Sequence, residues 1–216
     1  KEIRSLMEEQ EIPDELRKEI LEAYHILSSE KIDEKGVSTD ALNILKNAQE
    51  PIFVSVRSSA TTEDLADASF AGQQESFLNI KGDNRLLEHV LKCFSSLYTA
   101  RAIYYRNKKG FKEKDSLLAI VIQKMVDSEK SGVVFSRDPI NLSEDVVTEA
   151  VFGLGEGIVA GKIRPDHYIA SRDLKVKDIK VENKKIAIVR NSGGKNETVK
   201  LSEERSKSQV LTNGEI

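Results

Sequence analysis

The sequence predicts an α+β fold in which long helices pack on a mixed β-sheet. Apolar residues recur at helical spacing in two segments, 16–27 and 87–98, and each is expected to form a helix with one buried face. A continuous apolar run, 117–122, has the composition of a strand buried on both faces. Two later segments, 176–181 and 186–189, alternate polar and apolar residues, as strands with one face in water do.

Local signals mark the boundaries of the elements in the first half of the chain. Pro13 indicates the start of the first long helix, because proline at this position has no N–H to lose. A shorter helix is expected at 39–46, followed by an apolar strand at 52–56. Asp83 can cap the second long helix, and the cations and glycine of 107–110 are typical of a helix end.

Shorter strands are expected around and after these helices. Each is a brief apolar or alternating run bounded by glycine, proline or charged turn residues. They are predicted at 77–80, 133–136, 146–150 and 166–171. Beyond Asn191 the composition is polar, which predicts a loop or a poorly ordered tail.

Composition and charge limit the kind of protein this can be. The chain has 216 residues, enough for one large or two small domains, and its 39% hydrophobic and 32% charged residues fit a globular protein with a charged surface. A net charge of -3 gives no electrostatic footprint for nucleic acid. The longest apolar run, 117–122, is far too short to cross a membrane. Neither nucleic acid nor a membrane is therefore an expected partner.

Cysteine usage bears on the compartment. The chain has one cysteine, Cys93, so no intrachain disulfide can form and the cytoplasm is the expected location. Its place beside the apolar face of a predicted helix favours a packing role over a reactive thiol. The first residue is Lys1 and the last is Ile216, which favours a piece of a larger protein; an intact small protein without its initiator residue is the alternative.

The stretch from Ser55 to Ser76 is the strongest functional candidate. The predicted strand 52–56 delivers Arg57 at its end into some twenty residues rich in Ser, Thr, Ala and Gly. A loop that long is usually functional or disordered. Arg57 offers a planar fork of donors to phosphate oxygens, and small residues let the backbone approach a ligand closely. Ordinary polar loops have a similar composition, so the residues alone leave both interpretations open.

The residues of this stretch resemble a known family. The runs VRSSAT at 56–61 and ASFAGQQES at 68–76 are similar to the nucleotide-binding loop of the phosphoenolpyruvate synthase (pyruvate, water dikinase) family. Segments 94–106 and 131–139 resemble the same family, and the resemblance covers most of residues 3–171. Pyruvate phosphate dikinases and rifamycin phosphotransferases share this module. The resemblance implies an ATP-grasp-like fold in which two subdomains hold a nucleotide in a cleft.

This resemblance also implies a domain organisation and a set of ATP contacts. We expect a helical connector at 1–50, an ATP-grasp-like nucleotide-binding core at 51–190, and the polar tail of a truncated domain at 191–216. The positions expected to contact ATP are Arg57, the backbone at Gly72, Ser76 and Gln123.

The expected contact of Gln123 with ATP is also supported by the chemistry of its side chain. It follows the apolar run 117–122 and carries a donor and an acceptor, which suit the edge of an adenine ring. Without the family, a glutamine at a strand end is more often a surface residue. Arg137 and Glu149 are further candidates for nucleotide binding, and each has an alternative: Arg137 can pair with a nearby acid, and Glu149 can be solvated or ion-paired.

The glycine cluster at 152–157 fits neither classical phosphate loop. The dinucleotide fingerprint needs a third glycine where Ile158 stands. A Walker A loop ending at Gly161-Lys162 needs glycine at 156 and Ser or Thr at 163, where the chain has Glu156 and Ile163. The resemblance instead implies a Gly-Leu-Gly-Glu element near the nucleotide cleft, which Glu156 can line unless it is solvated or ion-paired.

The family implies a phosphotransferase that uses ATP. In such an enzyme ATP phosphorylates a histidine on another domain, and pyruvate then becomes phosphoenolpyruvate with release of AMP and phosphate. Arg57 would be the catalytic residue of this part, and the Mg²⁺ ligands are expected outside this chain, so the chain alone is expected to be inactive. Pyruvate would bind through other domains, and a homodimer of the full-length enzyme fits the resemblance. The alternatives are a rifamycin phosphotransferase, a pyruvate phosphate dikinase, or a nucleotide-binding module without catalysis.

Overall fold

A computed structural model describes most of the chain, which separates into two compact units, Lys1–Met125 and Val126–Ile216. The residues that the structure describes are 2–29, 50–60, 64–65, 68–69, 75–111 and 116–216. The helix expected at 39–46 lies outside these residues.

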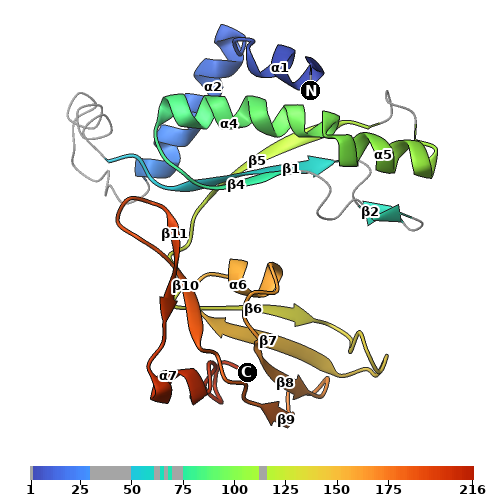
Figure 1. Ribbon diagram of the computed structural model, residues 1–216, viewed down its shortest axis with the longest axis vertical. Helices are drawn as coiled ribbons and strands as arrows, with labels where there is room; N and C mark the ends of the chain where they lie inside the picture. The colour runs from blue at the N-terminus through green and yellow to red at the C-terminus, as the bar shows by residue number, and fades with distance from the viewer. Residues whose placement is uncertain (1, 30–49, 61–63, 66–67, 70–74, 112–115) are drawn as a thin grey trace. The chain divides into compact units, whose positions relative to one another are not determined.

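The first unit is a small antiparallel sheet with helices on one face (Figure 1). Strand β1 is central, and the order of the sheet is β4-β1-β5. The elements are α1 (Glu2–Glu8), α2 (Asp14–Ser29), β1 (Val54–Ala60), β2 (Asp64–Leu65), β3 (Ala68–Ser69), β4 (Ser76–Ile80), α4 (Asp83–Ser95), the 3₁₀ helix η1 (Ser96–Tyr98), α5 (Ala100–Lys109) and β5 (Leu118–Lys124). Helix α2 begins at Asp14, directly after Pro13, as the sequence predicts.

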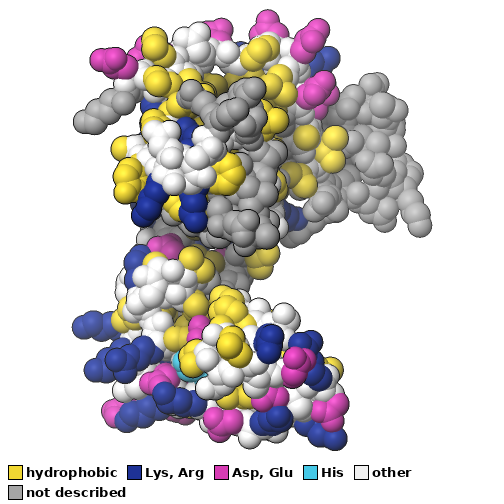
Figure 2. Space-filling view, turned by 90° about the vertical axis from the view of Figure 1, so that its right-hand side faces the viewer, with side chains coloured by type: hydrophobic (Ala, Val, Ile, Leu, Met, Phe, Trp, Pro, Cys, Tyr) yellow, Lys and Arg dark blue, Asp and Glu magenta, His cyan; other side chains and the backbone are white. Residues whose placement is uncertain are grey.

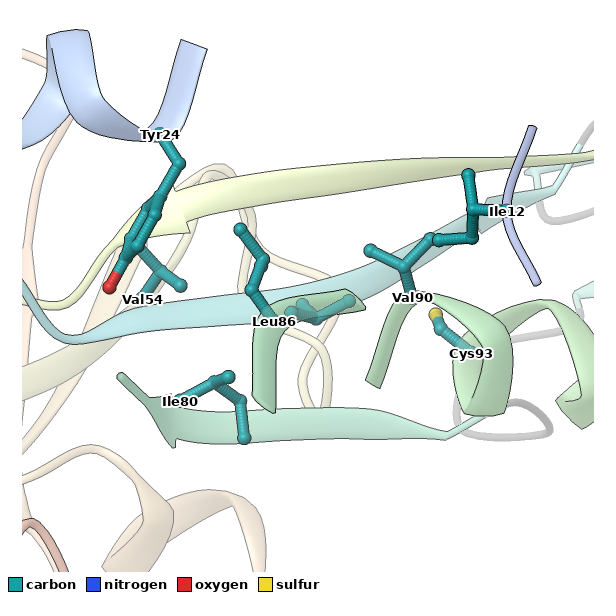
Figure 3. Close-up of a cluster of buried hydrophobic side chains, with 8 residues drawn as sticks. Ile12, Tyr24, Val54, Ile80, Leu86, Val90 and Cys93 are labelled. Carbon is teal, nitrogen blue, oxygen red and sulfur yellow. The ribbon is translucent and has the colours of Figure 1, made fainter. Parts of the chain in front are cut away.

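The core of this unit lies between the sheet and the helices. Val54 and Val56 of β1 are fully buried and point to the same face of the sheet. Tyr24 of α2 and Leu86 of α4 lie on this face together with Val54 (Figure 3). The buried cluster consists of Ile12, Tyr24, Val54, Val56, Ile80, Leu86, Val90 and Cys93. Burial raises the pKa of the Cys93 thiol to about 11, so Cys93 packs as a neutral apolar side chain, as the sequence predicts.

The second long helix is interrupted, although the sequence predicts one helix from Asp83 to 107–110. Helix α4 ends at Ser95, and a 3₁₀ turn connects it to α5. Thr99 has an extended backbone, and its hydroxyl oxygen accepts a hydrogen bond from the Ala102 N–H at 3.2 Å, so it caps a new helix. Helix α5 ends as predicted at Gly110, whose φ of 75° is left-handed.

The second unit contains a four-stranded antiparallel sheet and a separate β-hairpin (Figure 1). The sheet order is β6-β7-β8-β9, and β10 pairs with β11. The elements are β6 (Lys130–Phe135), β7 (Val146–Phe152), α6 (Glu156–Val159), β8 (Asp166–Ala170), β9 (Val176–Lys180), β10 (Ile186–Arg190), β11 (Asn196–Lys200) and α7 (Glu203–Lys207). Every pairing between named strands in the described residues is antiparallel, whereas the sequence predicts a mixed sheet.

A buried ion pair lies at the centre of the second unit. Asp166 of β8 and Lys184, which precedes β10, have side chains with no exposed surface, and the Lys184 Nζ donates to the Asp166 carboxylate. The same carboxylate accepts the Glu182 N–H at 2.8 Å and the Tyr168 hydroxyl at 3.2 Å. Burial raises the pKa of Tyr168 to about 12, which keeps this hydroxyl protonated and able to donate. The buried charges are thus paired and hydrogen-bonded, as burial requires.

The segment 191–216 is ordered, so the expectation of a polar loop or tail is wrong for most of it. It contains β11 and α7, and its later residues bind β8 through the backbone. The Val210 N–H donates to the Asp166 carboxylate at 2.9 Å, and the Leu211 N–H donates to the Tyr168 hydroxyl at 3.1 Å. These anchors are backbone groups, which a polar side-chain composition does not reveal.

The surface of the second unit carries both signs of charge. On the face drawn in Figure 2, lysine, arginine, aspartate and glutamate side chains are interspersed over the lower part of the molecule. This distribution agrees with the small net charge of -3. Among the described helices, none combines the length and apolar character needed to cross a membrane.

We expect Asp166→Ala to destabilise the second unit strongly. The change leaves the Lys184 ammonium buried without its counterion, and a broken buried pair costs about 3–5 kcal/mol. Asp166→Leu combined with Lys184→Met removes both charges and should cost clearly less. Urea unfolding of the full-length protein checks this, with the exposed Asp173→Ala as a control that should not change the midpoint. Equal losses in the single and double variants would contradict the expectation.

Candidate functional site

Arg57 lies inside the central strand of the first unit rather than at its end. The sequence predicts a strand at 52–56, but β1 runs from Val54 to Ala60. The reason is the pairing with β5, which continues along the whole of β1, from Val54 opposite Lys124 to Ala60 opposite Leu118. The serines after Arg57 are therefore part of a sheet, and Arg57 has a fixed backbone on both sides.

Strand pairing brings three of the predicted site residues together. Arg57 is the Cα partner of Ser76 in β4 and of Val121 in β5. Directly paired residues share a face of an antiparallel sheet, and Gln123 follows Val121 by two positions on that face. The Arg57 Nη1 donates a hydrogen bond to the Gln123 Oε1 at 3.3 Å. Arg57, Ser76 and Gln123 thus form one cluster, which we call the β1 face cluster.

The β1 face cluster lies opposite the helix-covered core. Val54 and Val56 point to the core, so Arg57 emerges on the other face, where Arg57, Ser76 and Gln123 are all exposed. Val121 on this face is 45% exposed, while Ile120 and Ile122 pack on the core cluster. The expectation that 117–122 is buried on both faces is therefore wrong, since within the described residues only one face of β5 is covered.

The chemistry of the β1 face cluster suits an anionic ligand with a polar edge. No carboxylate forms an ion pair with Arg57 in the part of the chain that the structure describes, so no described acid neutralises the guanidinium. Its planar fork binds phosphate oxygens in pairs, and the Ser76 hydroxyl adds a donor beside it. The Gln123 amide offers a donor and an acceptor on the same face. Gly72, the fourth expected contact, lies outside the described residues and stays a prediction.

Arg137 belongs to the second unit, two residues after the end of β6. Its Nε donates to the Leu142 carbonyl at 2.9 Å, and its side chain is exposed. The turn it closes is stabilised by Asp138, whose carboxylate accepts the Ile140 N–H at 2.8 Å and the Asn141 N–H at 3.0 Å. These donors, the Asn141 N–H first, lower the pKa of Asp138. The observed contact of Arg137 is thus within its own turn, and its role toward phosphate stays a prediction.

Glu149 also belongs to the second unit, on β7. Its Cα partner in β8 is His167, and the Glu149 Oε1 lies 3.3 Å from the His167 Nδ1. The side chain of Glu149 is 26% exposed. Glu149 therefore forms an ion pair with His167 when His167 is protonated, which is one of the alternatives considered for Glu149. The contact of Glu149 with a nucleotide stays a prediction.

The glycine cluster has a packing role in the second unit. Gly153 has a φ of 81°, and a Cβ placed on it would lie 2.2 Å from the Ile188 carbonyl oxygen of β10. This close approach allows the Leu154 N–H to donate to the same carbonyl at 2.7 Å. Gly153 N–H donates to the Glu129 carbonyl at 2.8 Å. The Gly153 N–H is therefore already bonded within the protein.

Glu156 forms an ion pair, which is one of the alternatives considered for its role near the nucleotide cleft. It is the first residue of α6, and its carboxylate accepts from the Lys162 Nζ at 2.8 Å and from the Asn196 Nδ2 at 2.7 Å. These two donors, Lys162 first, lower the pKa of Glu156. Glu156 thus connects α6 to β11. In the described residues, no group of three or more His, Cys, Asp or Glu side chains is arranged to hold a metal ion.

Two features near the β1 face cluster escaped sequence reasoning. Ser55 lies two residues before Arg57 on the same face, and its hydroxyl donates to the Gln123 carbonyl at 3.4 Å. The alternation Ser55, Arg57, Ser59 is visible in the sequence and could have indicated this face once a strand through Arg57 was assumed. The second feature is the contact of Glu75 with α1, for which the sequence contains no local signal.

The fold and the β1 face cluster define a class of protein. An α+β domain with a cationic, hydroxyl-bearing and amide-bearing sheet face is suited to binding a phosphorylated nucleotide. The whole chain, residues 1–216, matches the family described as pyruvate phosphate dikinase, AMP/ATP-binding domain. The chain belongs to this family, and the resemblance found in the sequence is confirmed.

Curated relatives support the same assignment. The chain is 49% identical over 166 residues to a probable phosphoenolpyruvate synthase of Archaeoglobus fulgidus, an alignment covering 76% of this chain and 22% of the relative. It is 42% identical over 218 residues to a probable phosphoenolpyruvate synthase of Methanocaldococcus jannaschii, covering 100% of this chain and 17% of the relative. It is 39% identical to the phosphoenolpyruvate synthase of Pyrococcus furiosus, covering 99% and 25%. The chain spans a quarter or less of each.

We expect Gly153→Ala to destabilise the second unit, because its backbone is left-handed and the new Cβ would overlap the Ile188 carbonyl. A loss of about 3 kcal/mol or more is the size expected for strain combined with a backbone clash. Gly155→Ala is the matched control: Gly155 has a φ of -61°, and its Cβ would meet the Ser131 Cβ at an ordinary 3.6 Å. Thermal unfolding compares the two. A tolerated Gly153→Ala would contradict the packing role.

Proposed function

We propose that this chain is the ATP-binding part of a phosphoenolpyruvate synthase (pyruvate, water dikinase) with an ATP-grasp-like fold. The observation that carries the proposal is the β1 face cluster, exposed on one sheet face of a chain that belongs to this family. The complete enzyme would convert ATP, pyruvate and water to phosphoenolpyruvate, AMP and phosphate through a phosphohistidine on another domain. Pyruvate would bind elsewhere in the full-length protein.

Each residue of the β1 face cluster has a distinct part in this proposal. Phosphoryl transfer needs positioning and charge neutralisation from the protein far more than covalent chemistry. Arg57 neutralises and orients phosphate oxygens, and its position inside a strand fixes it before the ligand arrives. Ser76 donates its hydroxyl to the same phosphates. Gln123 uses its amide for the edge of the base, and releases the Arg57 guanidinium when ATP binds.

Magnesium is the expected companion of ATP in this reaction, where it would neutralise phosphate charge. Among the described residues, no group of three or more His, Cys, Asp or Glu side chains is placed to hold a metal ion. We therefore assign no residue of this chain to the metal, whose ligands are expected elsewhere in the full-length protein.

Each of the three histidines has a partner for one of its ring nitrogens. The His25 Nε2 lies 2.9 Å from the Asp83 carboxylate, the His89 Nδ1 lies 2.6 Å from the Arg85 carbonyl, and His167 faces Glu149. All three thus have structural partners. This chain alone would be inactive in the overall reaction, and we place the full-length enzyme, a homodimer in our proposal, in the cytoplasm.

Two other functions share the same module. A pyruvate phosphate dikinase or a rifamycin phosphotransferase would use the same β1 face cluster and differ in the acceptor or in the phosphate product. A binding module without catalysis is a further alternative, and the presence of Arg57 without an acidic partner in the described residues argues against such a degenerate site.

We expect Arg57→Ala to lower turnover of the full-length enzyme by about a hundredfold or more, the size of losing one charged donor to the transition state. Arg101→Ala is the matched control, because Arg101 is an exposed arginine on α5 outside the β1 face cluster, and it should keep wild-type turnover. Steady-state assays of AMP formation measure both variants. Near-normal turnover of Arg57→Ala would refute the assignment of Arg57.

Phosphorus NMR tests the reaction itself. The full-length protein, incubated with magnesium, ATP and pyruvate, should form AMP, phosphate and phosphoenolpyruvate in equal amounts. Consumption of added phosphate with formation of pyrophosphate would instead identify a pyruvate phosphate dikinase. Intact ATP would contradict pyruvate as the acceptor, and calorimetry with ATP would then separate another acceptor from a module that does not bind nucleotide.

A further inference from the structure

A polar cluster connects the first helix to the start of β4. Arg4 of α1 donates from Nη1 and Nη2 to the two carboxylate oxygens of Glu75, at 3.4 and 3.1 Å. Its Nε donates to the Ser95 hydroxyl of α4 at 3.2 Å and to the Glu8 carboxylate at 3.3 Å. A fork that binds both oxygens of one carboxylate fixes its direction as well as its distance. Arg4 therefore holds Glu75 in a defined position.

Helix α1 is attached to the unit chiefly by these polar contacts. None of its residues is buried, and two of its three apolar residues, Ile3 and Leu6, are 50% and 62% exposed, while Met7 is partly exposed. Ser95, by contrast, is fully buried, and its hydroxyl donates to Glu8 at 2.5 Å. Such partly exposed ion pairs add little to overall stability. Arg4 and Glu8 instead fix the positions of Glu75 and Ser95, which they contact.

Glu75 lies next to the β1 face cluster. Glu75 directly precedes Ser76, the first residue of β4 and the Cα partner of Arg57. The Glu75 backbone is also held, since its carbonyl accepts the Cys93 thiol at 3.8 Å. Adjacent Cα atoms are about 3.8 Å apart, so a displacement of Glu75 moves Ser76 with it.

The other end of β4 is held in a similar way by α2. The Tyr24 hydroxyl accepts the Gly82 N–H at 3.0 Å and donates to the Ile52 carbonyl at 2.7 Å. Tyr24 is buried in the core cluster (Figure 3), so this anchor is part of the packing. The exposed start of β4 has the Arg4 contact instead. The two N-terminal helices thus hold the two ends of one strand.

We propose that Arg4 is a positioning residue for the nucleotide site: by binding Glu75 it fixes Ser76 opposite Arg57. This inference rests on the proposed function, because it assumes that Ser76 contacts ATP. Arg4 itself contacts no ligand. The N-terminal helix then contributes to ATP affinity from outside the site, through a single ion pair.

The test is steady-state kinetics of the full-length enzyme with ATP as the varied substrate. Arg4→Ala should raise the KM for ATP about fivefold with kcat within about twofold, since it removes ground-state positioning and no transition-state contact. Arg4→Lys keeps the charge and the ability to donate but loses the planar fork, and should restore part of the affinity. Glu75→Gln should reproduce Arg4→Ala, and the double variant should be no worse than either, because both act through one pair.

Two controls separate this role from general destabilisation. Glu8→Gln alters the contacts within α1 and with Ser95 while leaving Glu75 paired, and it should keep the wild-type KM. Lys18→Ala breaks the exposed pair of Lys18 with Glu22 on α2 and should do the same. A purely structural role would give equal losses in Glu8→Gln and Arg4→Ala, or a fall in the unfolding midpoint that Arg4→Lys does not restore. Either result would overturn the inference.

Measuring Arg57→Ala in the same assay separates the two parts of the proposal, which are the nucleotide site itself and the positioning role of Arg4. If Arg57→Ala loses turnover while Arg4→Ala keeps the wild-type KM, the positioning role of Arg4 is wrong and the nucleotide site stands. If Arg57→Ala is as active as the wild type, the site itself is wrong and the role of Arg4 falls with it.

Discussion

The alternation of side chains along β1 is the constraint on which the candidate site depends. Because β1 is paired on both edges, each of its side chains must point to one of two faces. Val54 and Val56 fill the core beneath the helices, and Arg57 is thereby forced onto the opposite face. A slip of one residue would bring the guanidinium into the core and the valines into water, at a cost that the unit could not offset. The apolar core and the cationic site are thus fixed by the same register.

Much of the fold could be predicted because apolar periodicity reports burial. It indicated α2, the helical region after Asp83 and the strand β5. It could not show the interruption before α5, which depends on a hydroxyl of Thr99 capping a new helix. It also failed for 191–216, where the anchors are backbone N–H groups of Val210 and Leu211 bound to β8. Apolar periodicity depends on side chains, so it cannot reveal contacts made by backbone N–H groups.

The candidate site was predictable residue by residue but not as an arrangement. Arg57 and Gln123 are 66 positions apart, and only strand pairing shows that their side chains meet. The family resemblance supplied both residues without their geometry. The glycine cluster is another case: the sequence showed that it fits neither classical phosphate loop, but not that Gly153 is required by the approach of the Ile188 carbonyl from a later strand. In both cases a contact between segments that are distant in the sequence determines the role of the residue. Amino-acid composition carries no information about such contacts.

The buried carboxylate of Asp166 has a consequence for how the second unit is assembled during synthesis. Asp166 leaves the ribosome before Lys184 and well before Val210, so a nascent chain holds this carboxylate while its partners are still missing. A charge without partners stays in water, since its burial is too costly. Strand β8 therefore cannot settle into its final packing until the last part of the unit has emerged. The sheet is expected to close late and in one step, after the N-terminal unit has folded.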